Sequence, residues 1–231
     1  MLGKEKFKTL ENVFDESTLR ILFKLSSQGY FDELQSPISV GKESNVFSAL
    51  KGKERVVVKI YRVNSCDFNR MYTYIRADPR FKGIQKQRRK VISLWARREY
   101  ANSLIARRAG AKVPAVHAVK ENVLVEEFIG KEKAAPKLKD KEPSNVKDFF
   151  EQLFTSLKKM YKEKLIHGDL SEYNILNNEE KAVIIDLSHG TSLQQPNAEY
   201  LLERDLHTIV NYFNKKGLTL TTEELLKKIK N

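Results

Sequence analysis

Apolar residues in the first part of the chain follow a helical spacing and then change to a strand spacing. The stretch from Asp15 to Gly29 carries leucine and phenylalanine at steps of three and four, and it predicts a helix that opens at polar capping residues. After Pro37, the runs ISVGKESNVFSAL and RVVVKIYRV are short and rich in β-branched residues. They predict a hairpin, and PAVHAVKENVLVEEFIG predicts two further strands.

A loop and a long helix are expected between these two pairs of strands. Residues 62–84 are aromatic, polar and irregular, which predicts a mobile loop. Residues 85–109 are expected to form one long helix. Val91, Trp95 and Glu99 follow one another at steps of four, so they share one stripe of this helix, and that stripe is expected to face inward.

The second half of the chain is richer in helical patterns. Residues 130–147 hold two prolines, many lysines and little that is apolar, and they are the best candidate for a linker. Amphipathic helices are expected at 146–165, 199–217 and 221–230, and a capping box opens the last of them.

This order of elements predicts an α+β protein with two lobes. A β-rich lobe with an extra N-terminal helix is expected over residues 1–129, and an α-rich lobe over residues 130–231. A chain of 231 residues is long enough for one such bilobal domain. A cleft between two such halves is where ligands usually bind.

The composition bears on the cellular compartment of the protein. No stretch of about 18 apolar residues is available to span a membrane, and the charged N-terminus lacks the apolar core of a signal peptide. The single cysteine, Cys66, excludes an internal disulfide and a cysteine metal cluster. We therefore expect a cytoplasmic protein with no membrane partner.

The chain is strongly basic, and the basic residues are unevenly spread. Its formal net charge is +12, a field that attracts polyanions such as nucleic acid. From Arg80 to Arg108 there are ten Lys or Arg residues and one acid, Glu99. This stretch is either a solvated helix face or a surface that binds RNA, and both interpretations stay open.

Two polar motifs follow apolar runs in the second half of the chain. Asp169 and Asn174 lie in HGDLSEYNIL, and Asp186 ends the run VIID ten residues later. A hairpin that turns at NNEE would bring all three residues to one end. Their oxygens suit Mg²⁺ that is shared with phosphate, and Asp169 could accept a proton from an attacking hydroxyl.

A lysine in a buried strand suggests a partner further along the chain. Lys59 lies inside the apolar run VVVKIY, where burial is costly unless an anion meets the ammonium group. The alternative is that strand alternation points it to solvent. Glu99, on the inward stripe of the long helix, is the expected partner.

The segment SVGKESNVF is a candidate phosphate-binding turn. Its residues Gly41, Lys42 and Ser44 could contact a phosphate, although no GxGxxG or Walker loop is present.

Taken together, these motifs resemble the protein kinase fold. A strand lysine, a helical glutamate, an H-x-D-x-x-x-x-N loop and an aspartate at the end of a strand occur in the expected order. The segments GKESNVF, VVVKIY, HGDLSEYNIL and IDLSHG resemble those of the RIO atypical serine/threonine kinases, and IDLSHG is similar to the IDxSQ of the first RIO subfamily. The likeness runs from about residue 15 to residue 217, and the chain looks archaeal-like because it lacks a long C-terminal extension.

The resemblance implies roles for the matching residues. It makes Asp169 the proton acceptor, and it makes Asn174 and Asp186 the metal ligands. Asp186 would also accept phosphate as an aspartyl intermediate. The implied ATP-binding residues are Gly41, Lys42, Ser44, Lys59, Glu99, Glu127 and Ile129. The last two would bind adenine through backbone groups, and the implied cofactors are ATP and Mg²⁺, or Mn²⁺ in its place.

Several positions depart from the pattern of ordinary kinases. Gly168 stands where those enzymes carry an arginine, and no APE motif follows Asp186, so the usual peptide-docking segment is missing. Glu126 occupies the position of the apolar gatekeeper, and His189 replaces a common glutamine. Asp205 is expected to hold the HGD segment by hydrogen bonds, with a solvent-exposed helical acid as the equal alternative.

The expected function is a RIO-type kinase or ATPase in maturation of the small ribosomal subunit. Its expected partners are ATP, the pre-ribosomal small subunit or its RNA, and protein serine residues, its own included. Two rivals stay open. One is a small-molecule phosphotransferase of the aminoglycoside-kinase type, and the other is a non-catalytic, ATP-bound RNA scaffold.

Overall fold

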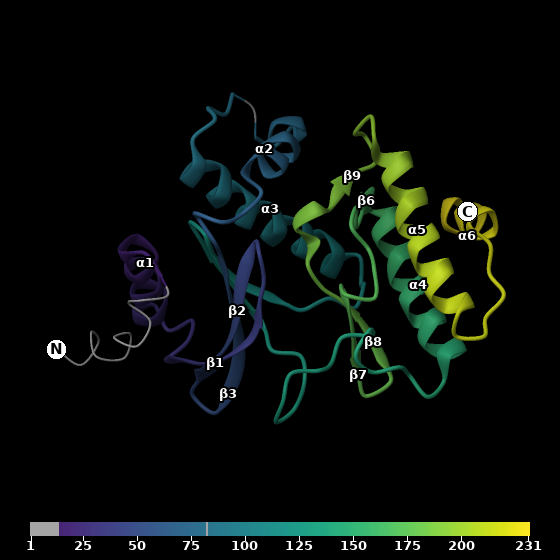
Figure 1. Ribbon diagram of the computed structural model, residues 1–231, viewed down its shortest axis with the longest axis horizontal. Coiled ribbons are helices and arrows are strands. Elements are labelled where there is room, and N and C mark those ends of the chain that lie inside the picture. The colour runs from purple at the N-terminus through teal and green to yellow at the C-terminus, as the bar shows by residue number, and fades with distance from the viewer. Residues whose placement is uncertain (1–13, 82) are drawn as a thin grey trace. The chain divides into compact units, whose positions relative to one another are not determined.

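The computed structural model describes residues 14–81 and 83–231 (Figure 1). By its internal contacts the chain divides into two compact units. The first unit comprises Met1–Tyr100 and Val116–Phe128, and the second comprises Ala101–Ala115 and Ile129–Asn231. The lobes expected from the sequence, residues 1–129 and 130–231, remain a prediction.

The first unit is built on an antiparallel five-stranded sheet with the strand order β1-β2-β3-β5-β4. Its strands are β1 (Glu33–Val40), β2 (Ser44–Lys51), β3 (Glu54–Tyr61), β4 (Val116–Lys120) and β5 (Val123–Glu127). The first strand starts earlier than predicted, four residues before Pro37. A proline is tolerated there because β1 lies at the sheet edge, and the register with β2 shifts on both sides of Pro37.

The two faces of this sheet have different coverings. Successive side chains of a strand point to opposite faces. Val58 and Ile60 of β3 therefore join a cluster with Leu22 and Leu25 of α1 (Glu16–Ser27), the predicted N-terminal helix, which lies beside the sheet (Figure 1). Tyr61 belongs instead to a cluster with residues of α3 (Arg88–Arg108), the predicted long helix.

The prediction of a mobile loop over residues 62–84 is wrong, because α2 (Phe68–Ala77) forms within it. Met71 and Ile75, one helical turn apart, are fully buried in a cluster with Trp95 of α3. The aromatic and apolar residues of this segment thus form a small core of their own. Their apolar pattern is short and interrupted by polar residues, so the sequence does not reveal this core without the partner helix.

The second unit is mainly helical. Its elements after the shared helix α3 are α4 (Val146–Lys162), β6 (Leu165–Ile166), β7 (Ile175–Asn178), β8 (Lys181–Ile184), a short 3₁₀ helix (Leu187–His189), β9 (Thr191–Ser192), α5 (Ala198–Asn214) and α6 (Thr222–Lys230). The three α-helices pack around a common apolar core, in which the rings of Phe150 and Phe213 meet edge to face at 5.2 Å. Nowhere in residues 14–81 or 83–231 does a helix combine the length and apolar character needed to cross a membrane.

Candidate active site

Two short two-stranded sheets hold the loops that carry the predicted catalytic residues. The HGD loop, residues 167–174, lies between β6 and β7, and the DLS loop, residues 185–190, lies between β8 and β9. Strand β6 pairs with β9, and β7 pairs with β8 around a turn at Glu179 and Glu180, as the sequence predicts. Because both ends of one loop are fixed to both ends of the other, the two loops run side by side.

Asp169, Asn174 and Asp186 lie on these adjoining loops. The side-chain amide of Asn174 donates to the carbonyl oxygen of Asp169 at 2.8 Å, and the Ile185 N–H donates to the Asn174 carbonyl at 3.0 Å. Asp186 adopts φ 62° and ψ 67°, and the Ser188 hydroxyl donates to its Oδ1 at 2.8 Å. A non-glycine residue in this left-handed region is uncommon, and such strain is concentrated at functional loops.

The prediction that Asp205 holds the HGD loop is confirmed, and the exposed alternative is excluded. Asp205 is 3% exposed, and its two carboxylate oxygens accept from the backbone N–H groups of Gly168 at 2.6 Å and Leu170 at 3.0 Å. Burial raises the pKa of this carboxyl, against the opposing influence of His167 and of the two amides. The loop backbone is thereby tied to α5 on both sides of Asp169.

Gly168 replaces the usual arginine for a steric reason. Its φ is +77°, and a Cβ added there would come within 2.6 Å of the His189 carbonyl oxygen. A guanidinium group reaches the loop from elsewhere: Arg204 Nη2 donates to the Gly168 carbonyl at 2.5 Å and lies 4.0 Å from Asp169 Oδ1. Arg204 was not among the residues predicted from the sequence, although a basic residue directly before Asp205 was an available signal.

Two further side chains support the DLS loop. Asn102 of α3, which is 1% exposed, donates to the carbonyls of Leu187 and Gly190 at 2.8 Å each. Asn102 was not predicted from the sequence either, and the signal that could have found it is a polar residue on the buried side of the helix, three residues after Glu99. His189, whose role the sequence left open, is buried with its Nδ1 4.0 Å from Asp169 Oδ2.

The first unit brings Lys59 and Glu99 together across a buried interface of β3 and α3. Lys59 Nζ donates to Glu99 Oε1 at 2.8 Å, and the two residues are 5% and 1% exposed. The solvent-facing alternative for Lys59 is therefore excluded. Tyr61, two residues along the same face of β3, donates its hydroxyl to Glu99 Oε2, and its ring lies 5.2 Å from Lys59 Nζ.

The predicted phosphate-binding residues lie at the turn between β1 and β2. The Gly41 N–H donates to the Ser44 carbonyl at 2.9 Å and closes this turn. A Cβ at Gly41 would lie 3.2 Å from that carbonyl, which is a tight contact. Lys42 at the tip is exposed, and Ser44, at the start of β2, is half-buried. Arg62 donates to the Gly41 carbonyl at 3.2 Å and supports the turn from the end of β3.

The predicted adenine-binding residues lie where the chain leaves the sheet. Glu127 is the last residue of β5, and it pairs with Val56 of β3. Ile129 follows two positions later, and its carbonyl accepts from the Ala135 N–H at 2.8 Å. Glu126 is half-buried within β5.

The donor groups of the two loops fit Mg²⁺ that also binds phosphate. Among the described residues, no three or more His, Cys, Asp or Glu side chains form a group that could hold a metal ion. Mg²⁺ is usually bound by one or two carboxylates together with the phosphate oxygens of a substrate. Asp186 supplies a carboxylate. Asn174 uses its amide nitrogen on the Asp169 carbonyl, so its amide oxygen points away from that bond.

Comparison with known families matches residues 45–226 to the RIO domain. The chain belongs to the RIO family. It is 40% identical over 215 residues to the RIO-type serine/threonine-protein kinase Rio1 of Haloferax volcanii, covering 92% of this chain and 74% of that protein. It is 41% identical over 229 residues to the protein of the same name from Methanocaldococcus jannaschii, covering 97% and 78%.

A solved RIO structure confirms the fold. The Rio2 kinase of Chaetomium thermophilum, in a complex with ADP/Mg²⁺ and phosphoaspartate, aligns with a TM-score of 0.70 and 22% identity. The alignment covers 91% of this chain and 65% of that one. The predicted kinase-like α+β fold is therefore confirmed, and the named RIO relatives make this chain a kinase, an enzyme of phosphoryl transfer.

Proposed function

We propose that this chain is a serine/threonine protein kinase of the first RIO subfamily that passes the γ-phosphoryl group of ATP to a serine hydroxyl, its own included. The HGD loop carries this proposal. The Asp169 side chain is 43% exposed, whereas that of Asp205, which holds the loop, is 4% exposed. A reacting group must be accessible to substrate, and the groups that position it must be fixed.

Each predicted residue has a proposed role in this reaction. Asp169 orients the attacking hydroxyl and accepts its proton. Lys59 orients the phosphates of ATP, and the buried carboxylate of Glu99 holds the ammonium group in position. Asn174 and Asp186 would bind Mg²⁺, which neutralises phosphate charge when it is bound.

We also propose nucleotide contacts for the residues of the β1–β2 turn and the end of β5. Gly41 allows close backbone approach, and Lys42 and Ser44 provide donors to phosphate. Glu127 and Ile129 bind adenine through the backbone. The engagement of the Ile129 carbonyl by Ala135 supports a contact through the N–H.

We further propose that Asp186 can itself accept the phosphoryl group. A carboxylate oxygen of Asp186 would bond to the γ-phosphorus as the bond to ADP breaks, and attack by water on the resulting acyl phosphate would release phosphate. Net ATP hydrolysis would follow. Treatment with hydroxylamine distinguishes the acceptors, because it cleaves an acyl phosphate and leaves a seryl phosphate intact.

The Asp169→Ala variant tests the proposed function. We expect it to abolish phosphoryl transfer from γ-labelled ATP while ATP binding stays within about tenfold, or roughly 1.4 kcal/mol, of the original chain. Label incorporation and nucleotide affinity are the two measurements. The matched control is Asp140→Ala, which removes a half-exposed carboxylate of the same unit.

Undiminished labelling in Asp169→Ala would contradict the role of Asp169. Loss of labelling in both variants would show that the effect is not specific to Asp169.

Finally, we propose that the kinase acts in maturation of the small ribosomal subunit and that its partner there is RNA. The family resemblance implies this setting, and the net charge of +12 supports an anionic partner. Exposed basic residues of α3 provide candidate contacts, and they are Arg88, Arg89, Lys90, Arg97, Arg107 and Arg108.

A further inference from the structure

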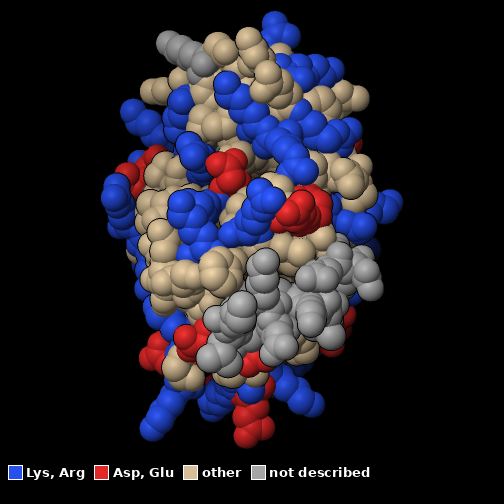
Figure 2. Space-filling model, turned by 90° about the vertical axis from the view of Figure 1, so that its left-hand side faces the viewer, with Lys and Arg blue, Asp and Glu red and all other residues tan. Residues whose placement is uncertain are grey.

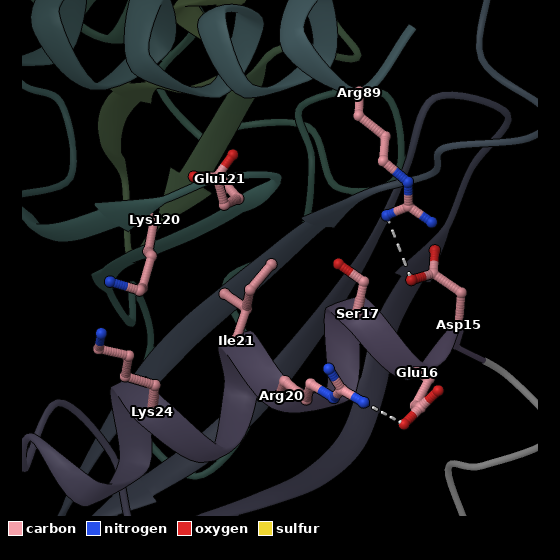
Figure 3. A pocket seen from close by; sticks show the side chains of 9 residues that line it. All are labelled: Asp15, Glu16, Ser17, Arg20, Ile21, Lys24, Arg89, Lys120 and Glu121. Carbon is pink, nitrogen blue, oxygen red and sulfur yellow. Dashed lines mark hydrogen bonds and ion pairs between the residues drawn. The ribbon is translucent and has the colours of Figure 1, made fainter.

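The first unit contains a hollow that the proposed kinase reaction does not use (Figure 3). Its volume is about 560 Å³. Helix α1 and its capping residue form one wall, the turn between β4 and β5 forms another, and the start of α3 closes a third side. The lining residues are Asp15, Glu16, Ser17, Arg20, Ile21, Lys24, Arg89, Lys120 and Glu121.

The walls of the hollow are fixed to each other by buried hydrogen bonds. Asn122, next to Glu121 in the β4–β5 turn, donates to the Thr18 hydroxyl of α1 at 3.1 Å and to the Tyr61 carbonyl at 2.9 Å. Thr18 and Asn122 are 2% and 5% exposed. The hollow is therefore a preformed feature of the fold, and a ligand would not have to order it.

The cations of the hollow differ in how they are neutralised. Arg20 lies 2.6 Å from Glu16, and Arg89 lies 3.5 Å from Asp15. The structure gives Lys24 and Lys120 no ion pair with a carboxylate within residues 14–81 and 83–231.

The ammonium groups of Lys24 and Lys120 lie side by side at one end of the hollow (Figure 3). Partial loss of hydration and then the neighbouring charge of Lys24 lower the pKa of Lys120, and Glu121 offsets this only in part. Two like charges held this close repel each other. An anion between them would remove the repulsion, and a phosphate oxygen suits two ammonium donors.

The surroundings of the hollow favour an extended anion over a small one. Its basic side chains are exposed or half-buried, and among residues 14–81 and 83–231 no glycine-rich loop lines it to close around a single phosphate. Lys and Arg side chains cover much of the face drawn in Figure 2, with acidic side chains in small groups between them. Such a surface attracts a chain of phosphates through charge, without recognising its sequence.

We propose that this hollow binds the phosphodiester backbone of a single RNA strand, with Lys24 and Lys120 sharing adjacent phosphate oxygens. The inference rests on the RNA partner proposed above, and it extends the contact from α3 to α1 and the β4–β5 turn. Neither lysine takes part in the proposed phosphoryl transfer, so binding and catalysis can be measured separately.

The test compares two double variants in binding to a labelled single-stranded RNA across a salt series. Lys24→Ala/Lys120→Ala removes the paired charges. The matched control, Lys51→Ala/Lys53→Ala, removes two exposed lysines of the β2–β3 turn in the same unit. We expect the first variant to bind about tenfold more weakly. The slope of log affinity against log salt should fall by about 0.7, since the two lysines share one phosphate and each single-strand phosphate contact contributes about 0.7.

The control should bind RNA as the original chain does, and both variants should keep the original thermal midpoint and label incorporation. Equal RNA binding by the two variants would overturn the proposal. If inorganic polyphosphate, and not RNA, distinguished them, the hollow would be a polyphosphate site and the RNA assignment would be wrong.

A third variant separates this proposal from the broader one. If Lys90→Glu/Arg97→Glu on α3 weakened RNA binding while Lys24→Ala/Lys120→Ala did not, the proposal of an RNA partner would be supported. The proposal that the hollow binds RNA would be overturned. If the original chain bound no RNA, both would be overturned, and the kinase proposal would still depend only on Asp169→Ala.

Discussion

At the scale of the residue, the group that is proposed to react is exposed, whereas the groups that hold the surrounding loops and side chains are buried. The Asp169 side chain is 43% exposed, whereas Asp205, Asn102 and Glu99 are each 3% exposed or less. Each of these buried residues makes at least one hydrogen bond to a loop or side chain of the proposed reaction. A change at a buried position should therefore alter geometry, while a change at Asp169 should alter chemistry.

Tyr61 offers a test of this division at a single hydroxyl. It donates to the Glu99 oxygen that Lys59 does not bind, so Tyr61→Phe would leave a buried carboxylate with one donor fewer. We expect the free energy of unfolding to fall by about 2 kcal/mol, as for loss of a hydrogen bond to a charged group. We also expect the KM for ATP to rise about tenfold, because a less constrained Glu99 holds Lys59 less well.

Denaturant unfolding and steady-state kinetics are the two measurements for this variant. Tyr72→Phe is the control, since Tyr72 packs in the same apolar cluster and has no hydrogen bond from its hydroxyl to other described residues. An unchanged KM together with unchanged stability in Tyr61→Phe would show that its hydroxyl does not hold the carboxylate.

At the scale of elements, ion pairs fasten the segment that contains α2 to α3. Asp78, the C-cap of α2, accepts from the Arg80 side chain at 2.5 and 2.9 Å and lies 3.3 Å from Arg98 Nε. Burial lowers the pKa of Arg98 to about 10, so the guanidinium remains charged at neutral pH. The ring of Tyr74, on α2, lies 5.1 Å from it.

The carboxylate of Asp78 should therefore stabilise the fold in a pH-dependent way. Burial alone would raise its pKa, but the bonds and charges of Arg80 and Arg98 outweigh this and lower it. Because the folded-state pKa lies below the unfolded one, the stabilisation is present above a pH of about 4 and is lost as the pH falls through the folded value.

The Asp78→Asn variant should lower the free energy of unfolding by about 3 kcal/mol at pH 7, since Arg98 loses its buried carboxylate partner. The difference from the original chain should shrink as the pH is lowered below about 4. Denaturant unfolding at a series of pH values measures both effects. Asp67→Asn is the control, because asparagine can replace aspartate as the N-cap of α2 while the charge is removed. A difference that does not vary with pH would contradict this account.

At the scale of the whole molecule, the net charge of +12 comes from Lys and Arg residues of both units and not from α3 alone. Of the two interpretations of the basic stretch from Arg80 to Arg108, the solvated helix face holds only in part, and the RNA-binding surface stays a prediction. Arg98 is buried and structural, and Arg88 packs 4.9 Å from the Phe68 ring and donates to the Val63 carbonyl. Lys90 and Arg97, seven residues apart on α3, are exposed and have no such contacts with the described residues.

RNA binding by the whole chain should weaken steeply as salt rises, because each phosphate that the protein neutralises releases counterions. The charge reversal Lys90→Glu/Arg97→Glu should weaken binding further, and it should reduce the salt slope by about 0.7 for each phosphate that is no longer neutralised. Filter binding or anisotropy across a salt series measures this. An affinity that is flat with salt and unaffected by the reversal would leave α3 with only a solvated face.

The sequence alone determined those features that depend on local order. Helical spacing placed Glu99 on an inward stripe, and the NNEE turn set the β7–β8 hairpin that brings Asn174 close to Asp186. These relations follow from periods of 2 and 3.6 residues, which any short segment carries by itself.

Only the tertiary structure decided which distant segments cover each other. It gave α2 a core with Trp95, brought Arg204 to the carbonyl of Gly168, and set Lys24 beside Lys120 at one end of a hollow. The physical reason is that a residue pattern shows which face of an element is apolar or charged but not which partner meets that face. That choice depends on contacts between residues as far apart in the sequence as α1 and the β4–β5 turn.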